Sequence, residues 1–130
     1  MKKLLIFLFT TVLLTACSSK AEPPQEKLVI SDPAKNLEAI VGNEFKIVID
    51  SNPSSGYHWE LGDDLDESIV AFVSTYYNPK SSAAPGSSGQ DVWVFKAMKA
   101  GEAHITLWYY SPSNELADPQ QKATFTVTVK

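Results

Sequence analysis

Few side chains in this 130-residue chain are suited to acid–base, nucleophilic or metal chemistry. The single cysteine is Cys17, and the two histidines, His58 and His104, are far apart in the sequence and lack the spacing of a zinc motif. Structural and catalytic zinc sites need three or four protein ligands, so two histidines are too few. An enzyme needs a nucleophile or base in a defined arrangement, and none is visible. We therefore expect no catalysis, no metal and no cofactor, with both histidines facing solvent and His58 close enough to a loop for a contact role.

The densest group of carboxylates lies at residues 63–67, where four of five side chains are acidic. A calcium loop of the EF-hand type needs acidic or amide side chains at alternate positions, a central glycine and a later glutamate. That spacing is absent here. We interpret the group as a solvated turn.

Cys17 lies in a segment with the features of an export signal. Lys2 and Lys3 precede an apolar run over residues 4–14, which is too short to span a bilayer as a helix. The four residues that end at the cysteine, Leu-Thr-Ala-Cys, resemble the bacterial lipobox, in which cleavage occurs just before the cysteine. This resemblance implies that Cys17 becomes the first residue of the mature protein and carries fatty acyl chains such as palmitate. Several chains would hold it firmly on a membrane.

This signal divides the chain into three parts. Residues 1–16 are a lipoprotein signal peptide, residues 17–27 are the lipidated cysteine and a flexible polar tether, and residues 28–130 form one domain. Removing Lys2 and Lys3 leaves nine lysines against fifteen acids, a net charge of −6, with no arginine in the chain. Nucleic acid is excluded as a partner, because it requires a basic face. We expect a monomer in the bacterial cell envelope, outside the cytoplasm; Ser18 favours the outer membrane if the organism is Gram-negative.

From residue 28 onward the hydrophobic period is two, which predicts strands. The clearest case is residues 122–130, where apolar side chains alternate with threonines. The other predicted strands cover residues 28–30, 36–41, 44–49, 57–61, 69–77, 91–98 and 102–110. Short hairpin-type breaks are expected at residues 41–44 and 99–102. Seven to eight short antiparallel strands without a helix-length segment indicate an all-β, immunoglobulin-like β-sandwich.

Three longer connections carry unusual turn chemistry, and we name them the first loop (residues 52–57), the second loop (79–89) and the third loop (111–121). Within the second loop, the candidate binding residues are 86–89. Within the third loop, they are residues 111–113. In a sandwich these loops can gather at one end. Their candidate binding residues are Asn52, Pro53, Ser54, Ser55, Gly56, Tyr57, Gly86, Ser87, Ser88, Gly89, Ser111, Pro112 and Ser113.

These motifs resemble those of the chagasin family. The first loop is similar to that family's N-P-T-T-G-Y/F, with Ser54 and Ser55 replacing the threonines. The second is similar to G-x-G-G, with Ser88 in the third position. In the third loop only Pro112 of the family's R-P-W or R-P-F remains. The resemblance runs over residues 28–130, with the motifs in family order.

The resemblance implies a reversible competitive inhibitor of papain-like, cathepsin-like cysteine proteases. The first loop would enter the catalytic centre of the protease, and the other two would hold the cleft on either side. The alternative is an immunoglobulin-like envelope lipoprotein that binds another protein or a wall polymer without inhibiting proteases. In that case, changes in the loops leave protease assays unaffected.

Overall fold

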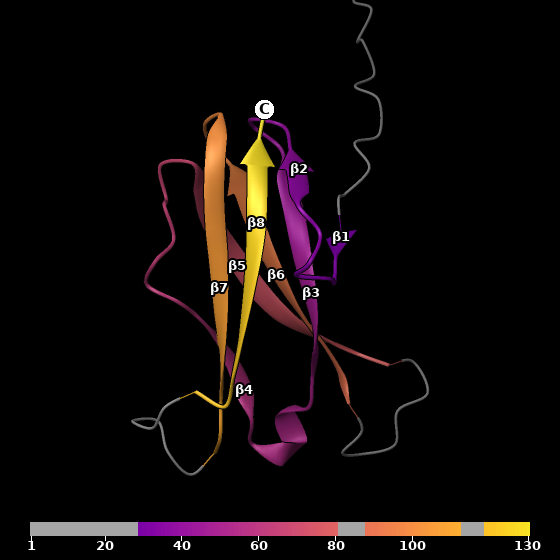
Figure 1. Cartoon of the computed structure of the whole chain (residues 1–130). Coiled ribbons are helices and arrows are strands. Elements are labelled where there is room, and N and C mark those ends of the chain that lie inside the picture. Colours follow the sequence, from indigo (N-terminus) through magenta and orange to yellow (C-terminus); the bar gives the residue numbers. More distant parts are fainter. Residues whose placement is uncertain (1–28, 81–87, 113–118) are drawn as a thin grey trace, which may run out of the picture.

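The structure, a computed structural model, describes residues 29–80, 88–112 and 119–130 (Figure 1). These residues form eight strands and one short 3-10 turn, η1 (Pro53–Ser55). The strands are β1 (Val29–Ile30), β2 (Leu37–Ala39), β3 (Glu44–Ser51), β4 (His58–Leu61), β5 (Val70–Pro79), β6 (Gly89–Ala97), β7 (Gly101–Tyr110) and β8 (Gln121–Val129). The predicted strands are all present, with ends that differ by at most two residues.

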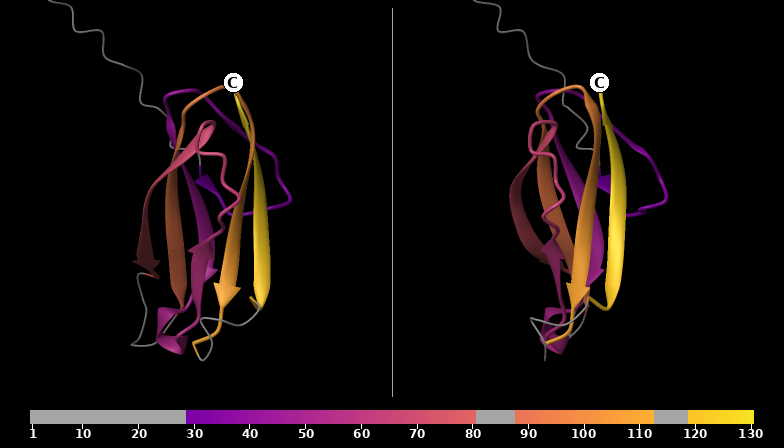
Figure 2. Two further views of the ribbon diagram at one scale, coloured as in Figure 1. Left: turned by 90° about the vertical axis from the view of Figure 1, so that its left-hand side faces the viewer. Right: turned by 60° about the vertical axis from the view of Figure 1, so that its left-hand side comes forward.

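The strands form two four-stranded sheets packed face to face (Figure 2). One has the order β1-β3-β6-β5 and the other β2-β8-β7-β4. This confirms the immunoglobulin-like sandwich. The neighbours β3·β6, β5·β6, β4·β7 and β7·β8 are antiparallel, whereas β1·β3 and β2·β8 are parallel. The prediction of antiparallel strands did not include these parallel pairs, which arise because the N-terminal segment adds one short strand to each sheet.

Alternate side chains from both sheets fill the space between them. Phe45, Ile47, Phe95, Ile105 and Phe125 are each no more than 1% exposed. Because successive residues of a strand point to opposite faces, this burial follows directly from the period-two pattern. Burial of apolar surface is the main stabilisation available to the domain, at about 25 cal/mol per Å².

Two turns were expected to be of the hairpin type but connect different sheets. The turn at residues 40–43 leads from β2 to β3, and the turn at residues 98–100 leads from β6 to β7. They lie side by side, because the Gly42 N–H donates to the carbonyl of Ala97 and the Ala97 N–H donates to that of Asn43. Both sequences form tight turns, but packing of the two sheets decides which strands they join.

The connection from β4 to β5 begins beside β7 and covers part of the outer face of the second sheet at its β4 edge. Thr106 lies on that face in β7, yet it is 1% exposed. Its hydroxyl donates to Asp64 Oδ2 at 2.9 Å, and the Gly62 N–H donates to the Thr106 carbonyl at 2.8 Å. The acidic segment expected to be a solvated turn therefore also covers part of the sheet, although Asp63, Asp64, Asp66 and Glu67 are themselves exposed.

The strands place the three loop attachments at one end of the sandwich, which we call the loop end. In the first sheet Ser51 pairs with Gly89, and Gly89 pairs with Pro79. In the second sheet His58 pairs with Tyr110, and Tyr109 with Gln121. The turns at 40–43 and 98–100, together with Lys130, lie at the opposite end, the turn end (Figure 1).

Candidate functional site

The first loop is a tight helical turn at the loop end. Pro53 supplies a fixed φ at the start of η1, and Gly56 closes the turn in the left-handed region, with φ 80° and ψ −9°. The Ser55 N–H donates to the Asn52 carbonyl and the Gly56 N–H to the Pro53 carbonyl, each at 3.0 Å. Residues 53–56 are nevertheless exposed. The loop thus has a defined shape while standing in solvent.

Side chains of the first loop add a second set of hydrogen bonds. The Ser54 hydroxyl donates to Asn52 Oδ1 at 2.6 Å, and the Ser55 hydroxyl donates to the Asn52 carbonyl at 2.6 Å. The Tyr57 N–H then donates to Ser55 Oγ at 3.3 Å. Side-chain bonds of this kind are the usual means by which Asn and Ser stabilise turns. They reduce the conformational freedom that the loop has to lose when it binds a partner.

The first and third loops touch at Gly56 and Pro112. A Cβ added at Gly56 lies 2.6 Å from the Cβ of Pro112, closer than real side chains approach. Gly56 is therefore required for two reasons, its positive φ and the proline beside it. The sequence predicts the first reason only. The contact shows that the third-loop motif supports the first loop.

Aromatic rings form the base of the first loop. The Tyr57 and Tyr109 rings stack with centroids 5.3 Å apart, and the Trp59 ring lies 4.7 Å from the Tyr109 ring. The indole N–H of Trp59 donates to the Asp50 carbonyl at 3.1 Å. Since Trp59 is in β4 and Asp50 in β3, this bond joins the two strands that carry the loop. The alternation of residues in these strands indicates a shared face, but not this bond.

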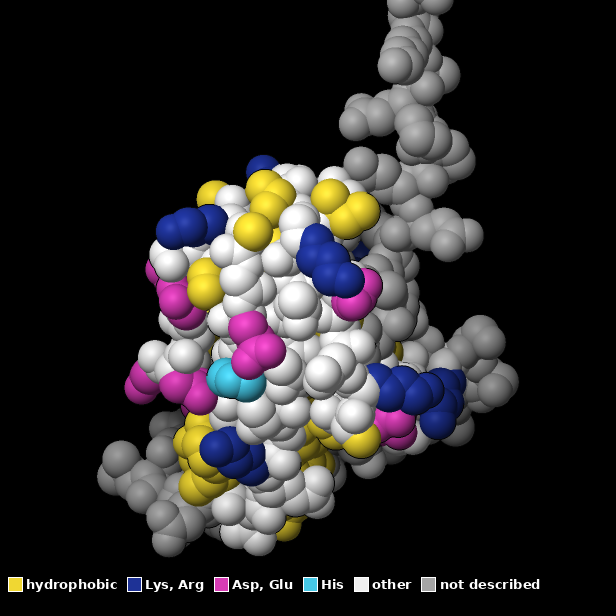
Figure 3. Space-filling model, turned by 45° about the horizontal axis from the view of Figure 1, so that its top comes forward, with side chains coloured by type: hydrophobic (Ala, Val, Ile, Leu, Met, Phe, Trp, Pro, Cys, Tyr) yellow, Lys and Arg dark blue, Asp and Glu magenta, His cyan; other side chains and the backbone are white. Residues whose placement is uncertain are grey.

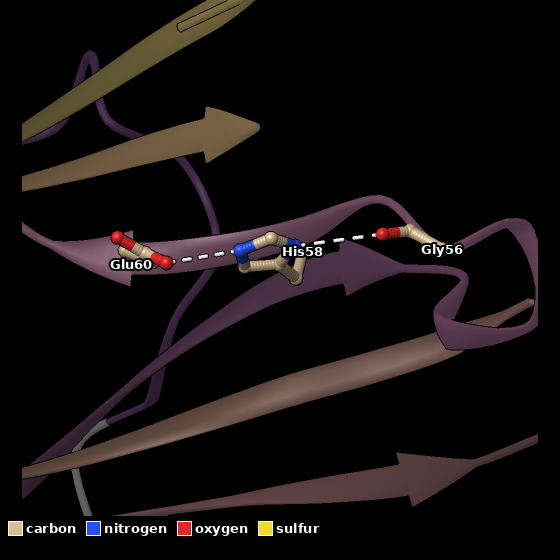
Figure 4. Close-up of polar contacts among 3 residues, drawn as sticks. All are labelled: Gly56, His58 and Glu60. Carbon is tan, nitrogen blue, oxygen red and sulfur yellow. Dashed lines mark hydrogen bonds and ion pairs between the residues drawn. The ribbon is translucent and has the colours of Figure 1, made fainter. Parts of the chain in front are cut away.

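His58 lies on the outer side of β4, where its ring contacts the loop (Figure 4). Nε2 is 2.9 Å from Glu60 Oε1, and Nδ1 is 3.4 Å from the Gly56 carbonyl oxygen. The His58 and Glu60 side chains are 42% and 56% exposed, so this pair contributes little to stability. Within the chain, His58 thus contacts the last carbonyl of the turn, and the contact role expected for it stays a prediction. His104 is exposed, as expected.

The second loop begins and ends in the first sheet, beside the first loop. Ser88 is exposed, but Gly89 is buried at the start of β6, where it pairs with Ser51 and Pro79. A Cβ at Gly89 lies 2.6 Å from the Asn78 carbonyl oxygen and collides with the Tyr77 ring. Gly89 thus allows close packing of β5 on β6 and fixes where the loop leaves the sheet.

The bulge in β5 explains how Tyr77 reaches Gly89. The register of β5 against β6 shifts between Phe72 and Ser74. Phe72, before the shift, packs its ring on Trp93 and Phe95 in the core. Because the extra residue reverses the alternation, an odd-numbered residue faces inward after it. The sequence gives no sign of this bulge.

The described residues unite parts of all three predicted motifs at the loop end. Asn52 and Tyr57 are half-buried, Ser111 is half-buried and Pro112 is exposed. The predicted residues Gly86, Ser87 and Ser113, and the proposed lipidation site Cys17, lie outside the described residues. The first loop contains no charged side chain. It lies between the described ends of the second loop, at Pro79 and Gly89 in the first sheet, and those of the third loop, at Tyr110 and Gln121 in the second sheet.

Neither a metal site nor a membrane-spanning helix is found in the described part of the chain. Nowhere in residues 29–80, 88–112 and 119–130 do three His, Cys, Asp or Glu side chains gather in a way that could hold a metal ion. No helix within the same ranges is long and apolar enough to span a bilayer.

Comparisons with known proteins give one family and a common fold. Residues 38–129 match the profile described as chagasin family peptidase inhibitor I42. No curated protein sequence matches the chain.

Three solved structures show the same fold. The cysteine protease inhibitor EhICP2 from Entamoeba histolytica is 18% identical with a TM-score of 0.64, and the match covers 79% of this chain and 94% of that one. Amebosin is 21% identical with a TM-score of 0.58, over 80% and 96% of the two chains. PbICP-C, solved in complex with falcipain-2, is 18% identical with a TM-score of 0.54, over 80% and 89%.

Proposed function

The chain belongs to the chagasin family of peptidase inhibitors, and on this basis we propose that it is a reversible competitive inhibitor of papain-like cysteine proteases. The first loop is the element that enters the catalytic cleft. The second and third loops contact the cleft on either side of it. The inhibitor acts by occupying the cleft and carries out no chemistry of its own.

One observation carries this proposal: an exposed, uncharged turn is held in a single shape at the loop end. The hydrogen bonds within residues 52–57 and the contact with Pro112 fix that shape before binding. A preformed loop loses little conformational entropy on association. Rigid, well-fitted surfaces of this kind are typical of tight protease–inhibitor complexes.

The geometry of the first loop disfavours its cleavage as a substrate. Attack by the protease thiolate requires an accessible carbonyl placed beside the nucleophile and its base, and substrates bind in an extended conformation. The loop is instead helical at Pro53–Ser55. The carbonyls of Asn52 and Pro53 accept hydrogen bonds from within the turn. The loop therefore fills the cleft without presenting an extended peptide bond.

The second and third loops differ in how well their residues suit contact with the same protease. Ser88 is exposed beside the first loop. In the third loop, Ser111 occupies the place at which the family motif has an arginine, and Ser113 the place of an aromatic residue. Arginine and aromatic side chains often dominate interface energies. Losing one contact of about 2 kcal/mol weakens binding roughly thirtyfold, so we expect nanomolar or weaker affinity.

A structural relative supports the class of partner. PbICP-C is bound to falcipain-2, which favours a papain-like cysteine protease over other peptidases. The chain acts as a monomer, because each copy carries all three loops. The lipobox-like sequence at Cys17 supports acylation and attachment to the bacterial cell envelope, with the domain facing outside the cytoplasm. A partner protease is therefore one that reaches the envelope from outside the cytoplasm.

Titration of residues 18–130 against papain and a cathepsin L-like protease, with a fluorogenic substrate, tests the function. We expect competitive inhibition, with KM raised and kcat unchanged. The absence of inhibition up to about 100 μM by a folded domain, equivalent to an affinity weaker than about −5.5 kcal/mol, would reject the proposal. That outcome would favour the envelope-binding alternative.

A further inference from the structure

The turn end carries exposed apolar side chains that the inhibitory loops do not explain. Ile40 is 64% exposed, Met98 is 48% exposed and Val41 is 44% exposed. They lie on the two adjacent turns joined by the hydrogen bonds of Gly42 and Ala97. Figure 3, with this end brought forward, shows apolar side chains gathered there with lysines beside them. We call Ile40, Val41 and Met98 the apolar end patch.

The N-terminal segment enters the domain near the apolar end patch. Val29 pairs with Lys46, the third residue of β3, and β3 begins at the turn end with Glu44. Eleven residues separate Cys17 from Val29. At about 3.6 Å per residue they reach at most about 40 Å, and a flexible chain of this length averages about 18 Å. A lipid on Cys17 therefore leaves the turn end within reach of the bilayer.

Lysines flank the apolar end patch, and acidic side chains lie near two of them. Lys99 follows Met98 and lowers the pKa of Asp66 through its charge, although hydrogen bonds from Ser68 are the larger cause. Lys130 Nζ lies 2.6 Å from Glu38 Oε1. Lysines beside exposed apolar side chains suit an interface with anionic phospholipid headgroups. A tethered patch needs little affinity of its own, because the tether supplies a high effective concentration.

A competing apolar surface lies on β5, where Phe72, Val73, Tyr76 and Tyr77 are between 37% and 47% exposed. However, β5 and β1 are at opposite edges of the first sheet. The anchor thus enters at the edge far from β5. The position of the entry point favours the turn end over the β5 edge.

We propose that the apolar end patch rests on the phospholipid surface to which Cys17 anchors the chain, so that the three loops face away from the membrane. The inference goes beyond inhibition and depends on acylation of Cys17. The ten residues of β7 span about 33 Å, so the loop end stands about that far from the lipid. A soluble protease can then approach the loops without meeting the bilayer.

The test uses the full acylated protein in vesicles of phosphatidylethanolamine and phosphatidylglycerol. Acylation consumes the only native thiol, so a bimane fluorophore labels only the introduced cysteine. The reporters are Val41→Cys at the apolar end patch, Gln121→Cys at the loop end and Ser74→Cys on β5. We expect lipids with a nitroxide near the headgroup to quench the probe at position 41 several-fold more than the other two. Replacing Ile40 and Met98 by serine should remove the difference and leave inhibition unchanged.

The possible outcomes distinguish failure of the docking from failure of the acylation at Cys17. Wild-type protein that itself takes up bimane and does not float with vesicles has a free Cys17, which overturns the anchor and the docking together. Protein that floats but shows equal quenching at 41 and 121, or stronger quenching at 74, overturns the docking alone. If quenching at position 41 depends on the number of proteins per vesicle and not on the nitroxide lipid, a second copy of the chain covers the patch. That result also overturns the docking on lipid. Protease inhibition is measured separately on the same samples.

Discussion

Gly56 lies directly against Pro112: a Cβ added to Gly56 falls 2.6 Å from the Cβ of Pro112 and 3.1 Å from its Cγ. Gly56 ends the turn of the first loop, and Pro112 lies in the third. Two segments more than fifty residues apart are therefore packed at a spacing that only glycine permits. The shape of the first loop depends on this packing as well as on its own sequence.

Replacing Gly56 with alanine should reduce inhibition more than tenfold. The methyl group needs the Pro112 ring to move, and alanine at φ 80° adds about 1–2 kcal/mol of backbone strain. The inhibition constant against papain and the free energy of unfolding in urea measure the two effects. Gly42→Ala is a matched control, since Gly42 has φ 87° and nothing within 4 Å of an added Cβ. It should lose similar stability and keep its affinity.

A second substitution distinguishes contact from strain at position 56. Pro112→Gly removes the atoms that the new methyl group meets, so the double variant with Gly56→Ala should recover part of the lost affinity. A double variant that binds no better than Gly56→Ala would show that the backbone strain alone accounts for the loss.

Bulky charged residues at the tip of the first loop should abolish inhibition with little effect on stability. Ser54 and Ser55 are exposed, so Ser54→Arg with Ser55→Arg should change the melting temperature by only a few degrees. Inhibition assays and thermal unfolding on one preparation make the comparison. A large parallel fall in melting temperature would show that the loop is mainly structural.

Rebuilding the family motif in the third loop should tighten binding. Ser111→Arg with Ser113→Trp restores the two residue types that most often act as interface hot spots, for a gain of up to about thirtyfold. The dissociation rate from papain, measured by surface plasmon resonance, should account for most of the change. An unchanged affinity would mean that this loop does not reach the protease.

Removing the indole N–H of Trp59 should destabilise the loop end. Trp59→Phe keeps an aromatic ring beside Tyr109 but loses the hydrogen bond to the Asp50 carbonyl. We expect a loss of about 1 kcal/mol in unfolding free energy, the usual net contribution of one hydrogen bond, with weaker inhibition. Trp108→Phe on the outer face of the same sheet is the control, and should leave affinity unchanged. Equal effects of both variants on affinity would contradict this role.

The ionisation of Asp66 should make the free energy of unfolding fall at low pH. Hydrogen bonds from the hydroxyl and N–H of Ser68, with the charge of Lys99 as a smaller cause, hold the pKa of Asp66 below its ordinary value of 3.8. A carboxylate with a lowered folded-state pKa contributes stability that is complete above the unfolded-state pKa and is lost as pH falls through the folded-state pKa. Urea unfolding between pH 5 and about pH 2 should show this loss, and Asp66→Ala should reduce it. An Asp66→Ala variant with the same pH profile as the wild type would remove Asp66 as the cause.

Local alternation in the sequence predicts most of the strand pattern. In β8, Phe125, Val127 and Val129 are buried as their spacing predicts, because consecutive strand residues must point to opposite faces. Pro53 and Gly56 likewise predict the position of the first loop, because proline fixes φ and glycine permits a positive φ.

The connections between strands and the contacts of the loops follow from long-range packing instead. The turns after β2 and β6 cross between sheets, Val73 forms a bulge that brings Tyr77 over Gly89, and Asp64 covers Thr106. These features depend on pairing and packing between residues tens of positions apart, for which local alternation carries no information. The contact of Gly56 with Pro112 is of the same kind: each residue favours a turn by itself, but their packing exists only after both sheets have formed and placed the two loops at one end.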